Sequence, residues 1–170
     1  MRLFLGLDLA PSTKMQIDHW RHKVLPEFPK VVPAANFHIT LAFLGSVEPR
    51  QLENLILGID NLQLPKVEII LDTLGFWSKP QILFLGTKTV TAELEALAKR
   101  LSGVARSCNI DVRQGEYRPH VTLVRKVKNN PPCALIDPSF ECKFSMMHLF
   151  ESVSGKQGVH YPIRHSWSLN

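Results

Sequence analysis

The sequence has few cysteines, and none of them lies in a metal-binding arrangement. Its three cysteines, Cys108, Cys133 and Cys142, form no CxxC pair and match no zinc-ligand spacing. An odd number of widely separated thiols is typical of a reducing compartment. We therefore expect neither a disulfide-stapled fold nor a cysteine-ligated metal.

Long apolar runs are also missing. No uninterrupted apolar segment approaches the ~20 residues that a membrane-spanning helix requires. The opening segment MRLFLGLDLAPSTK is interrupted by Asp8 and is followed by no small-residue cleavage site, so a first strand is a better interpretation than a signal peptide. We expect a soluble, cytoplasmic, monomeric protein with no membrane contact.

Neither sign of charge is in large excess. The 170 residues carry a net charge of +5, with 45% hydrophobic and 21% charged residues. This composition is ordinary for a folded chain, and the length predicts a single domain over residues 1–170. A modest positive excess suits a phosphate-bearing partner, and an ordinary basic enzyme surface explains it equally well.

Apolar periodicity predicts an α+β fold. Alternating leucines indicate a first strand over 3–9, and helical spacing predicts helices over 11–25, 49–62 and 91–108. Further strands are expected at 38–45, Val67–Leu74, Ile82–Thr87, around His120, around 140–150, and near 161–167. The order gives two similar half-units. We therefore expect two lobes related by a pseudo-twofold axis, with antiparallel sheets flanking a central cleft and helices outside.

One short pattern occurs twice in the chain. NFHITLAFLG contains His38 and Thr40, and RPHVTLVRK contains His120 and Thr122. With 7 histidines, 7 threonines and 23 leucines, His-x-Thr-Leu is expected only about 0.04 times by chance. The repetition therefore indicates a shared role.

The residue types of this pattern suit acid–base chemistry on a phosphodiester. Residues i and i+2 of a strand point the same way, so each histidine shares a face with its threonine. Two imidazoles on opposite sides of a phosphorus atom can activate water and protonate the leaving oxygen. Threonine hydroxyls can donate to the non-bridging oxygens. Such a site needs neither a metal nor another cofactor.

Other interpretations of the histidines remain open. A single histidine in a strand is usually a satisfied structural residue. Two histidines could also bind zinc, but a catalytic zinc usually has a third protein ligand, and no carboxylate lies beside either motif on the same face. A non-catalytic RNA-binding module is a further alternative. Intact histidines and threonines favour an enzyme.

At these residues the sequence resembles the two-histidine (2H) phosphoesterase superfamily, and within it the bacterial and archaeal RNA 2′,3′-cyclic phosphodiesterases (LigT or ThpR), once called 2′-5′ RNA ligases. The resemblance includes the opening RLFLGLDL, the two motifs, ILFLG and the closing LFESVSGKQGVHYPIRHSW. It implies a bilobal fold with one active-site cleft. It also implies hydrolysis of 2′,3′-cyclic RNA ends to 2′-phosphomonoesters, without a metal, and 2′-5′ ligation as the reverse reaction.

The resemblance also implies roles for individual residues. His38 would be the proton donor and His120 the proton acceptor, and Thr40 and Thr122 would hold the phosphate. Arg125 matches a basic position of the family. Further candidates for substrate binding are Phe43 as a stacking surface, Arg118 by period-2 counting from His120, and Tyr161 in the last strand. The expected partner is RNA with a cyclic phosphate end, tRNA halves included, or a small cyclic nucleotide.

Overall fold

The computed structural model describes the whole chain, residues 1–170, and its first strand forms the centre of the main sheet. In β1 (Arg2–Asp8) the leucines at odd positions and the following Leu9 are all at most 2% exposed. Burying one leucine contributes ~1.5–3 kcal/mol. The leucine alternation therefore fixes which face of β1 enters the core and leaves Phe4, Gly6 and Asp8 on the other face.

Two antiparallel sheets make up most of the fold. The larger has four strands in the order β11-β8-β1-β2, and the smaller has three in the order β4-β5-β6. The strands of the larger sheet besides β1 are β2 (His38–Ser46), β8 (Met146–Glu151) and β11 (Ile163–Ser168). Those of the smaller are β4 (Thr73–Trp77), β5 (Ile82–Gly86) and β6 (Val121–Val124). The expected α+β class with antiparallel sheets is confirmed.

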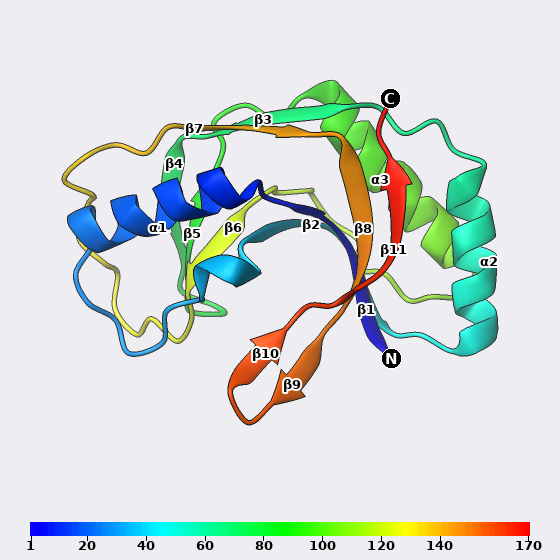
Figure 1. Cartoon of the computed structure of the whole chain (residues 1–170), viewed down its shortest axis with the longest axis horizontal. Helices are drawn as coiled ribbons and strands as arrows, with labels where there is room; N and C mark the ends of the chain where they lie inside the picture. The colour runs from blue at the N-terminus through cyan, green and yellow to red at the C-terminus, as the bar shows by residue number, and fades with distance from the viewer.

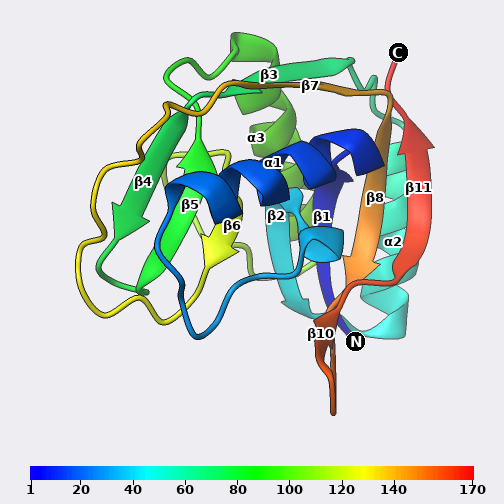
Figure 2. The ribbon, with the colours of Figure 1, turned by 60° about the vertical axis from the view of Figure 1, so that its left-hand side comes forward.

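Two further strand pairs join or extend these sheets. β3 (Val67–Leu71) pairs with β7 (Phe140–Phe144). β9 (Val153–Gly155) and β10 (Gly158–His160) form a hairpin that projects beyond the sheets (Figure 2). The sequence pattern did not predict this hairpin.

Three helices cover the sheets: α1 (Pro11–Val24), α2 (Pro49–Asp60) and α3 (Ala92–Ser107). Each was expected within two residues of its observed ends. On α3 the side chains of Leu94, Leu97 and Leu101 are buried, while Met15 on α1 is 72% exposed. None of the three helices combines the length and apolar character needed to cross a bilayer.

The two histidine motifs belong to matching units, and the helix of each unit packs outside its own unit. β1–α1–β2 and β5–α3–β6 each contain a strand, a helix and a motif strand, and the two strands of each unit pair. However, α1 packs on β7, with the Trp20 and Phe140 rings 5.9 Å apart, and α3 packs on β2. Figure 1 shows α1 beside β4 to β6, and α2 and α3 beside the four-stranded sheet. Each helix therefore contacts a strand of the other unit, since Arg21 of α1 also donates to the Leu123 carbonyl of β6.

Two of the predicted strands are each divided into two in the structure. The strand predicted over Val67–Leu74 divides at Asp72 into β3 and β4, and the one predicted around 140–150 divides at Ser145 into β7 and β8. In both cases the two halves join different sheets. The Asp72 carboxylate accepts hydrogen bonds from Thr73 Oγ1 and Lys88 N, which holds the chain at the division. The half-unit prediction assumed that the lobes are consecutive halves of the sequence. The four-stranded sheet instead combines strands from both ends of the chain.

Candidate active site

The two motif histidines are held in the same way. His38 lies at the start of β2, just after the short 3₁₀ helix η1 (Ala34–Asn36), and its Nδ1 is 2.7 Å from the Asn36 carbonyl oxygen. His120 directly precedes β6, and its Nδ1 is 2.8 Å from the Arg118 carbonyl oxygen. A carbonyl only accepts, so Nδ1–H is the donor in each ring. Nε2 of each imidazole is therefore the atom left for proton transfer.

The motif strands lie close enough for the histidines to interact. β2 and β6 contact each other. The pKa of His38 is lowered from 6.5 to about 4, first by burial and then by the charges of Arg125 and His120, against the hydrogen bond to Asn36 and the charge of Asp8. The pKa of His120 is also lowered, first by burial and then by Arg125, against the bond to Arg118. The guanidinium of Arg125 thus lowers the pKa of both histidines.

Aromatic side chains supply the low-dielectric surroundings that lower these pKa values. The ring of His38 has its centroid 4.9 Å from that of Phe4 and 4.9 Å from that of Tyr161. The ring of His120 lies 4.7 Å from Trp77 and 5.6 Å from Phe84. Each imidazole therefore has an aromatic wall that disfavours its charged form.

Gly6 allows the aromatic wall to reach His38. It pairs with Thr40 of β2 and with His148 of β8. A Cβ on Gly6 would lie 2.9 Å from the Ile39 carbonyl oxygen and 3.4 Å from ring carbons of Phe4 and Phe150. Glycine is thus required where β1 passes under the site.

We predict that Gly6→Ala damages both stability and turnover. The added methyl must push the Ile39 carbonyl, and with it the strand that carries His38, which costs ~1–3 kcal/mol of unfolding free energy. Misplacing a catalytic group by ~1 Å can lower kcat up to ~100-fold. Urea unfolding and kcat measure the two effects. The matched control is Gly103→Ala on α3, where a Cβ meets nothing within 4 Å. Equal behaviour of both variants would contradict this role of Gly6.

The threonines occupy the positions that the motif predicts. Thr40 follows His38 by two residues in β2, and Thr122 lies in β6 beside Phe84 of β5. Both are half-buried. The Thr40 carbonyl accepts a hydrogen bond from Tyr117 Oη at 3.0 Å. Tyr117 therefore links the segment before the second motif to the first motif strand.

The remaining candidates are placed differently from one another. Tyr161 stands edge-on to His38, and the two line a small pocket of about 80 Å³ together with Asn36 and Phe150. Phe43 is 61% exposed, with its ring 5.9 Å from Phe4. Arg118 does not direct its side chain to the site, since its guanidinium donates to Glu116 Oε2. What Arg118 contributes is its carbonyl oxygen, which orients His120.

A buried arginine behind the site escaped the sequence analysis. Arg21 on α1 is 5% exposed and donates to the carbonyls of Val32 at 2.7 Å and Leu123 at 2.9 Å. Its guanidinium also lies 5.0 Å from the ring centroid of Phe37, the residue before His38. One side chain therefore supports both motif strands. An arginine within an otherwise apolar helix stripe was the signal that could have revealed it.

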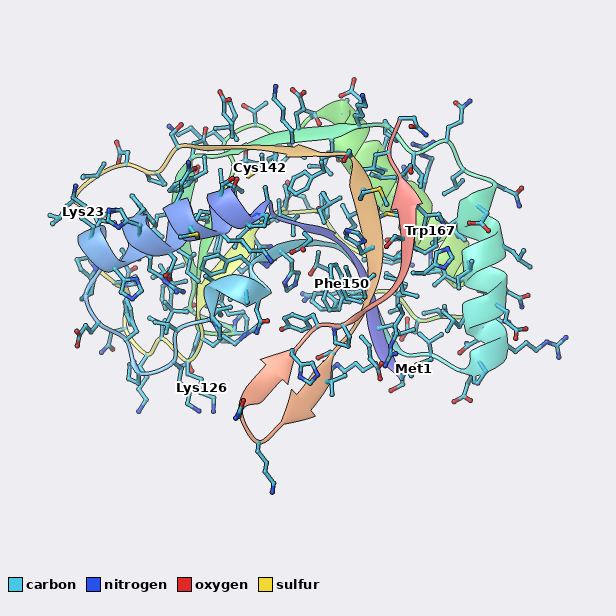
Figure 3. All side chains as sticks on the ribbon, viewed as in Figure 1. Met1, Lys23, Lys126, Cys142, Phe150 and Trp167 are labelled. Carbon is cyan, nitrogen blue, oxygen red and sulfur yellow. The ribbon has the colours of Figure 1, made fainter.

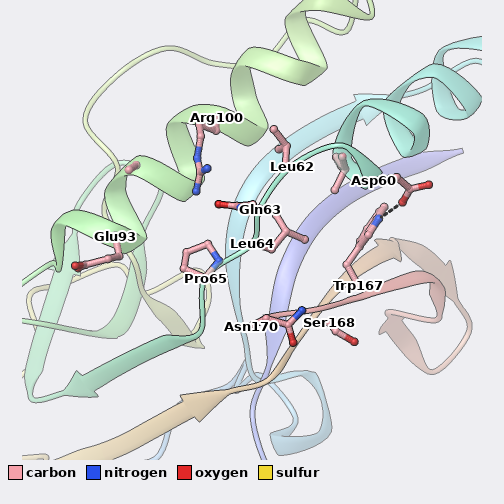
Figure 4. Close-up of a pocket in the computed structure, with 12 residues that line it drawn as sticks. Asp60, Leu62, Gln63, Leu64, Pro65, Glu93, Arg100, Trp167, Ser168 and Asn170 are labelled. Atoms are coloured by element: carbon pink, nitrogen blue, oxygen red, sulfur yellow. Dashed lines mark hydrogen bonds between the residues drawn. The ribbon is translucent and has the colours of Figure 1, made fainter.

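A larger pocket of about 910 Å³ lies elsewhere, between α2, α3 and β11 (Figure 4). Trp167 Nε1 donates to Asp60 Oδ1 across it at 2.8 Å, and Arg100 and Glu93 line it. It contains no histidine, so it lacks the acid–base pair that the motifs provide.

Comparison with known proteins agrees with this arrangement. A family model described as LigT like phosphoesterase matches residues 7–84, which include the first motif. The RNA 2′,3′-cyclic phosphodiesterase of Escherichia coli is 29% identical over 99% of this chain and 96% of that protein. The crystal structure of Escherichia coli LigT complexed with ATP is 30% identical, with a TM-score of 0.86, over 99% of this chain and 96% of that chain. The crystal structure complexed with 3′-AMP is 28% identical, with a TM-score of 0.91, over 99% of this chain and 97% of that chain. The matches that span the whole chain cover the second motif as well, and the chain therefore belongs to the LigT-like phosphoesterase family.

Proposed function

We propose that this protein hydrolyses the 2′,3′-cyclic phosphodiester at the end of an RNA to a 2′-phosphomonoester. The observation that carries the proposal is the matched pair of histidines. Each donates from Nδ1 to a carbonyl two residues earlier, and the charge of Arg125 lowers the pKa of both. Relatives that match most of the chain are named RNA 2′,3′-cyclic phosphodiesterase, which supports the choice of substrate.

In this mechanism the two Nε2 atoms work on opposite sides of the phosphorus. Water attacks phosphorus while His120 Nε2 takes its proton. The bond from phosphorus to the 3′ oxygen breaks, and His38 Nε2–H gives that oxygen a proton. The hydroxyls of Thr40 and Thr122 donate to the non-bridging oxygens as their charge builds, and Arg125 offsets that charge.

The lowered pKa of His38 is compatible with a donor role because the substrate is an anion. Without bound substrate, the lowered pKa leaves His38 neutral at pH 7. A phosphodiester held between the rings carries a negative charge, which favours the protonated form of both imidazoles. Substrate binding thus raises the pKa of the donor when the proton is needed.

The same groups serve 2′-5′ ligation. If a 5′-hydroxyl replaces water as the nucleophile, its proton goes to His120, the bond from phosphorus to the 3′ oxygen breaks as before, and two RNA ends are joined through a 2′-5′ linkage. The reverse of this step is cleavage of the 2′-5′ linkage by the 3′-hydroxyl, and mass action decides between the two directions. The direct test of the hydrolytic proposal is to incubate the protein with an RNA ending in a 2′,3′-cyclic phosphate and to locate the product phosphate by ³¹P NMR. We expect a 2′-phosphate. An exclusive 3′-phosphate, or no product, would contradict the proposal.

We predict that Arg125→Ala moves the pH profile upward. The guanidinium disfavours both imidazolium forms, so its removal raises the pKa of His38 and of His120. Both limbs of the kcat/KM profile should therefore shift to higher pH, and substrate binding should weaken, most strongly at low salt. The control is Arg106→Ala on α3. An unmoved profile with unchanged KM would remove Arg125 from the site.

A further inference from the structure

The end of the three-stranded sheet beyond Arg125 gathers lysines from three chain segments. Leu83 of β5 pairs with Val124 of β6, which puts the β4–β5 turn beside the segment that follows β6. In that segment Val127 N donates to the Gln81 carbonyl at 3.0 Å, and Arg125 N donates to the Lys30 carbonyl at 3.1 Å. We call this surface the basic edge and define it by its exposed lysines, Lys30, Lys79, Lys126 and Lys128.

The charges of the basic edge have no acidic partners. Six ion pairs form within 4.0 Å in the structure, and none involves a lysine of the basic edge or Arg125. By contrast Lys14 is 2.7 Å from Asp8. Four ammonium groups and one guanidinium therefore present unneutralised positive charge, which attracts a polyanion.

The backbone holds this surface in an uncommon shape. Gln81 and Lys126 have positive φ angles of 66° and 59°, in the left-handed region that residues other than glycine seldom occupy. The bond from Val127 N to the Gln81 carbonyl ties these two turns together. Figure 3 shows Lys126 at the outer surface of the molecule, below the end of β6. The lysines are thus carried on a fixed edge.

The spacing from the histidines to the basic edge suits a strand of RNA. The four residues of β6, Val121–Val124, separate His120 from the segment that carries the basic edge, and at ~3.3 Å per residue they cover ~13 Å. Stacked nucleotides rise ~3.4 Å each, so about four of them span the same length. Lysines at this distance would meet phosphates upstream of the terminal nucleotide.

We propose that the basic edge binds the sugar–phosphate backbone of the RNA about four nucleotides upstream of its cyclic phosphate end. The inference rests on the proposed function and extends it, because it makes the preferred substrate an oligonucleotide and not a small cyclic nucleotide. Phosphate contacts of this kind set affinity and register and carry no base preference.

The test compares two RNA lengths in two variants of equal charge. The basic edge variant is Lys30→Gln/Lys79→Gln/Lys126→Gln/Lys128→Gln. The control variant, Lys66→Gln/Lys99→Gln/Lys143→Gln/Arg106→Gln, removes four exposed charges elsewhere. Binding is measured by fluorescence anisotropy with a dinucleotide and a decanucleotide that end in a 3′-phosphate, and kcat/KM is measured with the same lengths ending in a 2′,3′-cyclic phosphate.

We expect the basic edge variant to bind the decanucleotide ~10–100-fold more weakly at low salt, with a salt slope shallower by about 3, since each single-strand phosphate contact contributes ~0.7. Its activity on the dinucleotide and the behaviour of the control variant should not change. Wild-type affinity for the decanucleotide in the basic edge variant, or equal losses at both lengths, would overturn the inference. Absence of hydrolysis at either length in wild type would instead overturn the proposed function, and the binding data would still decide the basic edge.

Discussion

Replacing either His38 or His120 with alanine is expected to lower kcat/KM for an RNA 2′,3′-cyclic phosphate by ~10²–10⁴-fold, the usual contribution of a positioned acid or base. The fold should survive both changes, because each ring is held by one backbone carbonyl and by contacts with aromatic rings at the edge of the core. Thermal unfolding measured beside the kinetics separates lost chemistry from lost structure.

The double variant should lose less than the product of the two single losses. Once one proton transfer is missing, the other histidine no longer acts in the same transition state, so the effects are not additive. His19→Ala, an exposed histidine on α1, is the matched control and should keep full activity. Near-full turnover in His38→Ala or His120→Ala would contradict the paired mechanism.

The second large effect concerns the leaving group. If His38 is the proton donor, a substrate whose bridging 3′ oxygen is replaced by sulfur should need no proton, because a thiol has a pKa near ~8.5 and leaves as the thiolate. The defect of His38→Ala should then shrink from ~10²–10⁴-fold to about 10-fold or less. His120→Ala should remain fully impaired, since water still has to lose its proton.

This comparison also resolves the order of the two roles. Without bound substrate the pKa of His38 is lowered to about 4, and the pKa of His120 is also lowered. The family resemblance implies that His38 is the donor, although burial disfavours its protonated form. Rescue of His120→Ala alone by the sulfur substrate would reverse the roles, and rescue of neither variant would refute acid catalysis of the leaving step.

The repeated motif made the position of the candidate site predictable, because it falls on β2 and at the start of β6, two strands that contact each other in the fold. The division of strands at Asp72 and Ser145 was not predictable in the same way. Apolar alternation continues up to both residues, and which sheet each half joins depends on partners far away in the sequence, as in the pairing of β3 with β7.

The side chains that surround the histidines could not be predicted from the sequence, for the same reason. Phe4, Phe150 and Trp77 are distant from the motifs in sequence, so the burial that lowers the pKa of His38 could not be seen. Period-2 counting from His120 made Arg118 a candidate for the site. However, β6 begins only at Val121, and the Arg118 side chain forms an ion pair with Glu116. Periodicity predicts a face only where the strand is formed.

The pH dependence of kcat/KM for wild-type protein, from about pH 3.5 to 9 with an RNA 2′,3′-cyclic phosphate, tests the two-histidine mechanism most directly, since it reports the essential groups of the free enzyme. The profile should be a bell belonging to the coupled pair, with both limbs below 6.5 because burial lowers both pKa values. The corresponding kcat profile should lie at higher pH, because bound phosphate favours the protonated rings. A flat kcat/KM profile across this range, with chemistry shown to be rate-limiting, would contradict acid–base catalysis by His38 and His120.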